Sequence, residues 1–110
     1  MKLFLDDERP VPEGWAGARW PSDVVHLLQS GTVTHVSLDH DLGDAEAAAR
    51  EGRVERTGYD VLVWLEEQVF ADAGFPVPEL SIHSANAAGR ERMTRAIESI
   101  ERLRSGRGRR

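Results

Sequence analysis

Short apolar runs alternate with longer stretches whose apolar positions are three or four residues apart. The runs at 2–5, 34–38 and 79–82 are bounded by turn residues or charged side chains, a pattern typical of central strands in a parallel sheet. A weaker run, Ala-Arg-Trp at 18–20, predicts a short edge strand. We therefore expect about four strands.

Three stretches have helical spacing, which predicts helices over 21–30, 57–73 and 87–103. Ser22 is the expected N-cap of the first helix. Thr57-Gly58-Tyr59-Asp60 resembles a capping box at the start of the second. The inward positions of the second helix are Val61, Leu62, Leu65 and Val69, and those of the third are Met93, Ile97 and Ile100.

Strands that alternate with helices predict an α/β fold, a small open parallel sheet with helices on both faces and right-handed crossovers. The proline-rich stretch 9–16 excludes a regular helix after the first strand. We expect a single domain over residues 1–104 and a flexible basic tail over 105–110. The polar stretch 44–56 is expected to be either a lid or a plain surface insertion.

Composition and charge exclude several classes of protein. The 110 residues contain no cysteine, which excludes disulfides and thiolate metal sites. No apolar run has the length of a signal peptide or a membrane span, which predicts a cytoplasmic protein of bacterial type. The net charge is −5, and since residues 102–110 carry five arginines and no acid, residues 1–101 carry −10. Such an acidic body argues against sequence-specific DNA binding; the composition sets no oligomeric state.

Ionisable side chains follow each of the three central strands. The carboxyl ends of parallel strands meet at one edge of the sheet, where open α/β sheets keep their active sites. Carboxylates there can bind a divalent cation, and imidazoles can transfer protons near neutral pH. The residues expected together at this edge are Asp6, Asp7, Asp39, His40, Asp41, His83 and Ser84.

The start of the last helix predicts an anion site at the same edge. The free amides after Asn86 face the strand ends, and Arg90 is one turn into the helix. Each feature also has a purely structural interpretation: strand-end acids can be solvated turns, and Ser84 and Asn86 can be a helix cap. His26 and His35 we interpret as polar residues without a catalytic role or as structural residues.

Four stretches, LFLDDERPVP, SLDHDLG, TGYDVLVWLE and HSANAAGRERM, are together similar to the cyclic-phosphate processing receiver domains. These are a divergent branch of the response-regulator receiver domains, and the similarity extends over residues 3–93. The resemblance implies a receiver-like sheet in the order 2-1-3-4, without the first helix and fifth strand of ordinary receivers. It also implies an activity on cyclic phosphates, such as the 2′,3′-cyclic ends of RNA or of nucleotides.

The differences from an ordinary receiver favour catalysis over signalling. Asp39 stands where receivers have their phosphoacceptor, but the lysine that pairs with the phosphoryl group is missing, since Lys2 is the single lysine. His40 and His83 stand where receivers generally have no histidine. The loss of the lysine that a phosphorylation switch needs, together with the gain of two histidines that can act as acid or base, indicates an enzyme.

The expected reaction is phosphoesterase chemistry on a cyclic phosphodiester. The phosphate is expected to bind the amides after Asn86, the guanidinium of Arg90 and the hydroxyl of Ser84. One of His40 and His83 acts as the base on water, and the other protonates the leaving ribose oxygen. The sequence does not distinguish their roles.

The carboxylates have two possible roles in this reaction. Asp6, Asp7 and Asp39 either hold Mg²⁺, as the resemblance implies, or orient the two histidines. Asp39 is counted with the catalytic histidines, and Asp41 supports them in either case.

Three other functions fit the same residues. The chain can be a signalling module that accepts a phosphoryl group at Asp39, or a protein that binds a cyclic phosphate or nucleotide without cleaving it. The Asp39-x-Asp41 spacing is also found in phosphatases of the haloacid dehalogenase type. Those enzymes need a lysine and further acids in a larger fold, which makes this the weakest of the three.

Overall fold

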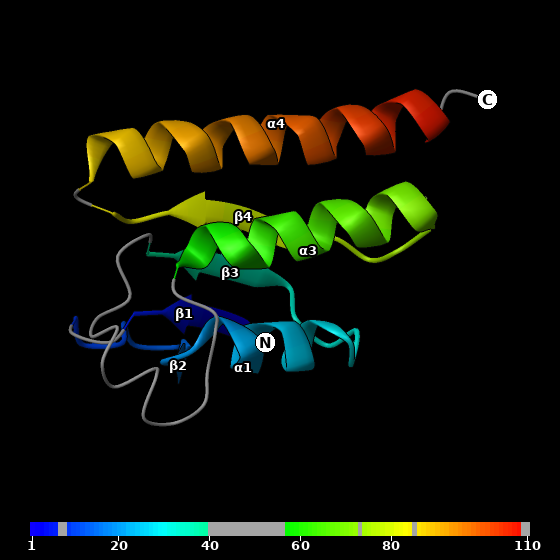
Figure 1. The fold of residues 1–110 in the computed structure, drawn as a ribbon. Helices are drawn as coiled ribbons and strands as arrows, with labels where there is room; N and C mark the ends of the chain where they lie inside the picture. The colour runs from blue at the N-terminus through cyan, green and yellow to red at the C-terminus, as the bar shows by residue number, and fades with distance from the viewer. Residues whose placement is uncertain (7–8, 40–56, 73, 85, 109–110) are drawn as a thin grey trace.

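A computed structural model describes residues 1–6, 9–39, 57–72, 74–84 and 86–108 of the chain. Four parallel strands form one sheet in the order β2-β1-β3-β4 (Figure 1). They are β1 (Lys2–Leu5), β2 (Ala16–Ala18), β3 (His35–Leu38) and β4 (Glu79–Ile82). The α/β class, the parallel pairing and the strand order expected from the resemblance are confirmed.

The edge strand and the first helix differ in detail from the sequence-based expectation. β2 ends at Ala18, because Trp20 is the N-cap of α1 (Pro21–Leu28) and Pro21 occupies its first turn. Proline suits that position, since its missing N–H needs no partner there and its φ is already helical. The prediction of Ser22 as the N-cap was therefore wrong.

The second predicted helix is α3 (Gly58–Ala71), and its capping box is confirmed. The backbone N–H of Thr57 donates to Oδ2 of Asp60 over 3.1 Å. The four apolar positions predicted to face inward are all fully buried. The helix ends before the predicted residue 73 because Asp72 has extended backbone angles.

The last helix, α4 (Ala87–Gly108), begins where the sequence predicts but extends beyond the predicted Leu103. Residues 105–108, assigned to a tail from the sequence, therefore belong to the helix. Ion pairs along its exposed side add local support, such as Arg95 to Glu91 at 2.6 Å. None of the described helices is long and apolar enough to cross a membrane.

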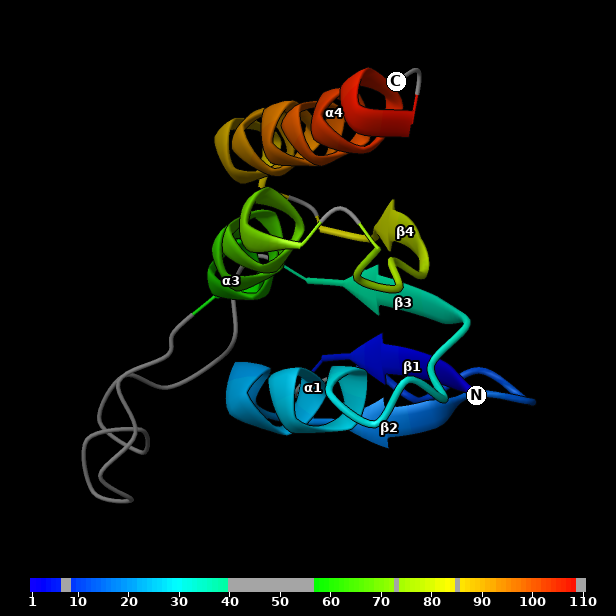
Figure 2. The ribbon, with the colours of Figure 1, turned by 90° about the vertical axis from the view of Figure 1, so that its right-hand side faces the viewer.

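The described helices share one face of the sheet, contrary to the expectation of helices on both faces. Leu3, Leu5, Val36 and Leu38 project from that face into a single hydrophobic core, which contains residues of α1, α3 and α4. Figure 2 shows α1 and α3 on the same side of the strands, while α4 packs along α3 and the β4 edge.

The direction of the connections explains this one-sided arrangement. The β2–β3 and β3–β4 connections run the same way across the sheet, so right-handed crossovers place their helices on the same face. The β1–β2 connection runs the opposite way, and a helix there would cover the second face. Its described part, 9–15, is the proline-rich stretch and contains no helix.

Candidate functional site

Three of the predicted site residues lie side by side at the carboxyl edge of the sheet. Leu5, Leu38 and Ile82 pair across β1, β3 and β4, so the residue after each strand follows in the same register. Each of Asp6, Asp39 and His83 has one possible metal-ligand atom within 4.8 Å of the others'. We call these three residues the strand-end cluster. Of the other residues predicted at this edge, Ser84 is described below, whereas Asp7, His40 and Asp41 lie outside the described part of the chain, as does the stretch 44–56.

Asp6 is the buried acid of the cluster, with a side chain 1% exposed. Its Oδ1 accepts the backbone N–H of Arg9 at 2.9 Å, and its Oδ2 lies 3.1 Å from Nε2 of His83. The guanidinium Nε of Arg9 is 3.9 Å from the same Oδ2. A buried carboxylate is costly without such partners, so these contacts fix its position.

His83 is held on three sides. Its ring stacks on the ring of Phe4, with centroids 4.1 Å apart and planes 7° from parallel. Nδ1 lies 2.6 Å from Oγ of Ser37, and Nε2 faces Asp6. Because a carboxylate can only accept, a neutral His83 carries its proton on Nε2, and the Ser37 hydroxyl donates to Nδ1. The orientation of the imidazole is therefore defined before any ligand binds.

Burial lowers the pKa of His83 below its usual value of 6.5. Burial is the largest single effect. The hydrogen bond to Asp6 and the negative charges of Asp6 and Asp39 raise the pKa, the positive charge of Arg9 lowers it, and the net result is a lowered pKa. The imidazole is therefore mainly neutral at neutral pH. A neutral imidazole can take up a proton or bind a cation.

The start of α3 holds the backbone of Asp39 in place. The N–H of Gly58 donates to the carbonyl oxygen of Asp39 over 3.0 Å, and the N–H of Asp39 donates to Leu5 over 3.1 Å. A Cβ at position 58 would overlap the Asp39 carbonyl oxygen, so this close approach requires glycine. The first turn of α3 thus sets the position of one cluster carboxylate.

The predicted phosphate-binding residues form a helix cap. The Ser84 hydroxyl accepts the N–H of Asn86 at 3.1 Å, and Oδ1 of Asn86 accepts the N–H of Gly89 at 2.8 Å. The guanidinium of Arg90 donates to the Ser84 carbonyl oxygen at 3.3 Å. These contacts fit the structural interpretation of Ser84 and Asn86. Phosphate binding by the three residues stays a prediction.

Sequence reasoning missed Ser37, Phe4 and Arg9, which hold His83 and Asp6. The strand alternation could have indicated Ser37, since it places this hydroxyl between two buried apolar residues and on the opposite face of β3. The His83 ring lies toward that face because of its side-chain torsion angle, which no sequence pattern predicts. The guanidinium of Arg9 also donates to the carbonyl oxygen of His83.

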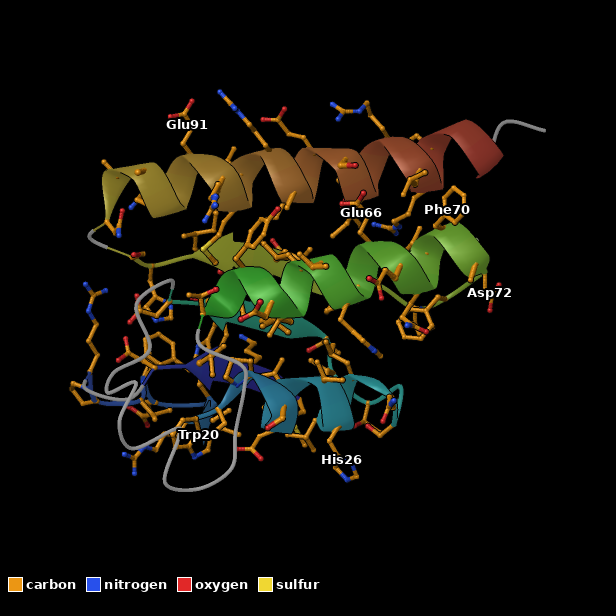
Figure 3. The ribbon with its side chains drawn as sticks, viewed as in Figure 1. Trp20, His26, Glu66, Phe70, Asp72 and Glu91 are labelled. Atoms are coloured by element: carbon orange, nitrogen blue, oxygen red, sulfur yellow. The ribbon has the colours of Figure 1, made fainter. Side chains whose placement is uncertain are left out.

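The remaining described histidines and the single lysine lie elsewhere. His26 is exposed on α1 and points away from the sheet (Figure 3). His35 is at the amino end of β3, where its Nε2 is 2.9 Å from Oε2 of Glu79. The ammonium group of Lys2 lies over the Trp15 ring at the amino end of β1, the end opposite Asp6. His26 is thus an exposed polar residue, the contact with Glu79 fits a structural role for His35, and the lysine lies away from the cluster.

A cavity of about 390 Å³ lies along α3 and not at the cluster. It is lined by Tyr59, Val63, Glu66, Glu67 and Phe70. All five belong to one helix, and no cluster residue is among them. The strand-end cluster therefore lies outside this cavity.

The fold and the strand-end cluster define a receiver-like α/β domain with a histidine among its strand-end acids. The family model described as "Cyclic-phosphate processing Receiver domain" matches residues 1–99. The chain belongs to this family. Neither a curated protein nor a solved structure matches the chain.

Proposed function

We propose that the protein hydrolyses cyclic phosphodiesters, with the strand-end cluster activating the attacking water. The substrate class is a 2′,3′-cyclic phosphate on a nucleotide or an RNA end. The observation that carries the proposal is the Asp6–His83 pair, with Oδ2 and Nε2 3.1 Å apart and Asp39 beside them. Family membership supports processing of a cyclic phosphate, and the pair supports hydrolysis as the reaction.

The cluster has the chemical groups that water activation requires. A neutral imidazole and two carboxylates can together accept the proton of an attacking water molecule. Asp6 stabilises the charge that His83 gains, as an orienting carboxylate does in other catalytic pairs. The position of the ring changes little, because Phe4 and Ser37 hold it from the other sides.

Two arginines can balance the charge of a bound phosphate. The guanidinium of Arg9 donates to the carbonyl oxygen of His83, and that of Arg90 donates to Ser84. Both cations are thus fixed against the segment that follows β4. Arginine binds phosphate oxygens through paired N–H donors, which suits this anion.

The bond changes follow from these positions. The oxygen of water forms a bond to phosphorus, and the bond from phosphorus to one ribose oxygen breaks. His83 takes the proton of the water at Nε2, from the tautomer in which the ring proton lies on Nδ1 and Oγ of Ser37 accepts it. With His83 as the base, the role of the acid that protonates the ribose oxygen falls to His40, the residue after Asp39, and Asp41 supports it. Both residues lie outside the described part of the chain.

The cluster also fits a divalent cation. Asp6, Asp39 and His83 would hold it, and the sequence adds Asp7 as a fourth candidate. A bound cation of this kind polarises a phosphoryl oxygen or lowers the pKa of a water molecule. Mg²⁺ is the cation that the resemblance to receivers implies.

Turnover of 2′,3′-cyclic AMP and of RNA with a cyclic end, with and without EDTA, tests the proposal. We expect hydrolysis by the wild-type protein and a loss of about 10²- to 10⁴-fold in kcat/KM for His83→Gln. His26→Gln, which alters an exposed histidine, is the matched control and should retain wild-type rates.

Three results would contradict the proposal or favour another function. Undiminished turnover by His83→Gln would exclude the role of the cluster. A ligand that binds but stays intact after long incubation would indicate a binding protein. Phosphorylation of Asp39 by acetyl phosphate, without turnover, would indicate a signalling module.

A further inference from the structure

We propose that His83 is a nitrogen ligand of a divalent cation held with Asp6 and Asp39, and that Ser37 positions it. The site would then prefer Zn²⁺ over Mg²⁺. Oxygen ligands alone suit Mg²⁺, whereas an imidazole nitrogen favours later first-row metals. With a cation on Nε2, His83 would hold the ion and could not take up the proton of the water, so water activation would fall to the cation. The inference rests on the proposed function for this role, but cation binding itself is measured without substrate.

The spacing of the cluster atoms supports a shared ion. Two ligands at right angles, each about 2.1 Å from a metal ion, are roughly 3 Å apart. Oδ2 of Asp6 and Nε2 of His83 are 3.1 Å apart, and the three ligand atoms lie within 4.8 Å of one another. An ion can therefore take the place of the hydrogen bond between Asp6 and His83 with little movement of either side chain.

The residues around Asp6 and His83 hold the two side chains in the orientation of metal ligands. Oδ1 of Asp6 accepts the backbone N–H of Arg9 at 2.9 Å, which directs Oδ2 toward His83. The stacking on Phe4 holds the plane of the imidazole ring. Outer contacts of this kind orient metal ligands and raise their affinity.

Ser37 allows the ring proton of His83 to move from Nε2 to Nδ1 when a cation binds, because a hydroxyl can either donate or accept a hydrogen bond. Without a cation, the neutral His83 carries its proton on Nε2 and accepts the Ser37 hydroxyl at Nδ1. With a cation on Nε2, the proton must lie on Nδ1, and Oγ of Ser37, 2.6 Å away, accepts it. The hydroxyl only has to rotate, so the ring can bind the ion without turning over.

Calorimetric titration of the wild-type protein with ZnCl₂, MnCl₂ and MgCl₂, without substrate, tests the preference. We expect the dissociation constant for Zn²⁺ to be at least about tenfold lower than that for Mg²⁺, with the value for Mn²⁺ between them. Equal or tighter binding of Mg²⁺ would overturn the inference. His35→Ala is the control for adventitious zinc at the exposed His35–Glu79 pair, and should retain the cluster affinity.

Ring ¹⁵N spectra with Zn²⁺ identify the ligand atom. Zinc should shift the Nε2 signal of His83 and place the proton of this ring on Nδ1, while the signals of His26 should stay unchanged. An unchanged His83 spectrum at saturating Zn²⁺ would overturn the assignment. This measurement needs no variant.

Substitution at position 37 tests the positioning role. Ser37→Ala should weaken Zn²⁺ binding about 10- to 100-fold, and Ser37→Thr should restore it because the hydroxyl is kept. Ser81→Ala is the matched control, since Ser81 pairs in register with Ser37 on the same face and is exposed. Wild-type Zn²⁺ affinity in a folded Ser37→Ala protein would overturn this role; if that variant does not fold, the Nδ1 proton of the wild type decides.

Separate readouts distinguish this inference from the proposed function. Cation binding with the expected preference but no turnover of any cyclic phosphate would reject the proposed function alone. Turnover that EDTA does not affect, together with no cation binding, would reject the inference alone.

Discussion

At the scale of residues, His83 connects the parts of the site. Its ring contacts Phe4 from β1 and Ser37 from β3, and its Nε2 faces Asp6. Its carbonyl oxygen accepts the guanidinium of Arg9. Contacts from three separate segments therefore converge on one side chain, whereas an ordinary receiver relies on its acids and a lysine.

The lowered pKa of His83 predicts a dependence of stability on pH. The folded protein binds a proton at His83 less readily than the unfolded chain does. The stability that the folded state gains from holding a neutral His83 is therefore fully present above pH 6.5. It is lost as the pH falls through the lower pKa of the folded state. Urea unfolding between about pH 7.5 and pH 5 should therefore show a steeper loss of free energy of unfolding for the wild type than for His83→Gln.

His26→Gln is the control for this measurement, because it removes an exposed histidine on α1. Its profile should follow that of the wild type. Parallel profiles for the wild type and His83→Gln would contradict the assigned effect of burial on His83.

Strand register allowed the meeting of Asp6, Asp39 and His83 to be predicted from sequence. Each residue directly follows a strand, and parallel strands bring such positions together whatever the side chains are. The partners of the ring could not be predicted in this way. Ser37 contacts Nδ1 only because the His83 ring lies over the face of the sheet, where it stacks on Phe4.

At the scale of elements, the close contact of α3 with the end of β3 determines the shape of the edge. Gly58 lies at the first turn of α3, where its N–H donates to the Asp39 carbonyl oxygen. An added Cβ would also lie 3.1 Å from Cβ of Leu38 and from Cε of Met93. The helix can reach the strand end only with no side chain at this position.

Gly58→Ala should therefore destabilise the fold and displace Asp39. Overpacking of this kind costs about 1–3 kcal/mol, since the neighbours include backbone that cannot move aside freely. Chemical unfolding measures the loss, and the ring signals of His83 report any change at the cluster. Gly74→Ala is the matched control, because its Cβ would contact only Oδ1 of Asp72 at 3.3 Å in an exposed turn. Equal stability of the two variants would contradict the close contact.

The sequence predicted the central strands better than the helix ends. β1 and β4 have the expected bounds because short apolar runs leave little freedom. α4 extends past its last inward apolar residues, because its polar final turns lie where hydrophobic spacing no longer marks a boundary. Helix ends depend on local capping and ion pairs, which are weak signals in a sequence rich in Arg and Glu.

At the scale of the whole molecule, the sheet has one face under helices and one face under a loop. The N–H of Trp15 donates to the carbonyl of Pro12 at 3.1 Å, and Gly14 has a φ of 85° that favours glycine. This turn places the Trp15 ring beside Phe4 and His35, both at a centroid distance of 6.3 Å. The proline-rich loop thus replaces a helix as the cover of the second face.

Trp15→Ala tests whether this cover supports the site. The side chain is half-buried, so we expect a loss of about 2 kcal/mol, below the 3–5 kcal/mol typical of a fully buried tryptophan. Urea unfolding measures this loss, and Trp15→Phe should recover part of it. Because Trp15 packs on Phe4 and Phe4 stacks on His83, the ring signals of His83 and His35 should both shift.

Trp64→Ala separates a general loss of stability from an effect on this face. Trp64 is also half-buried but packs on Phe75, with ring centroids 5.7 Å apart, on the helical side of the molecule. At a similar loss of stability, it should leave the ring signals of His35 and His83 unchanged. If both variants shift those signals equally, the loop has no particular role in the site. If only Trp15→Ala shifts them, the proline-rich loop, which stands in place of a helix, also holds the His83 ring of the strand-end cluster in position.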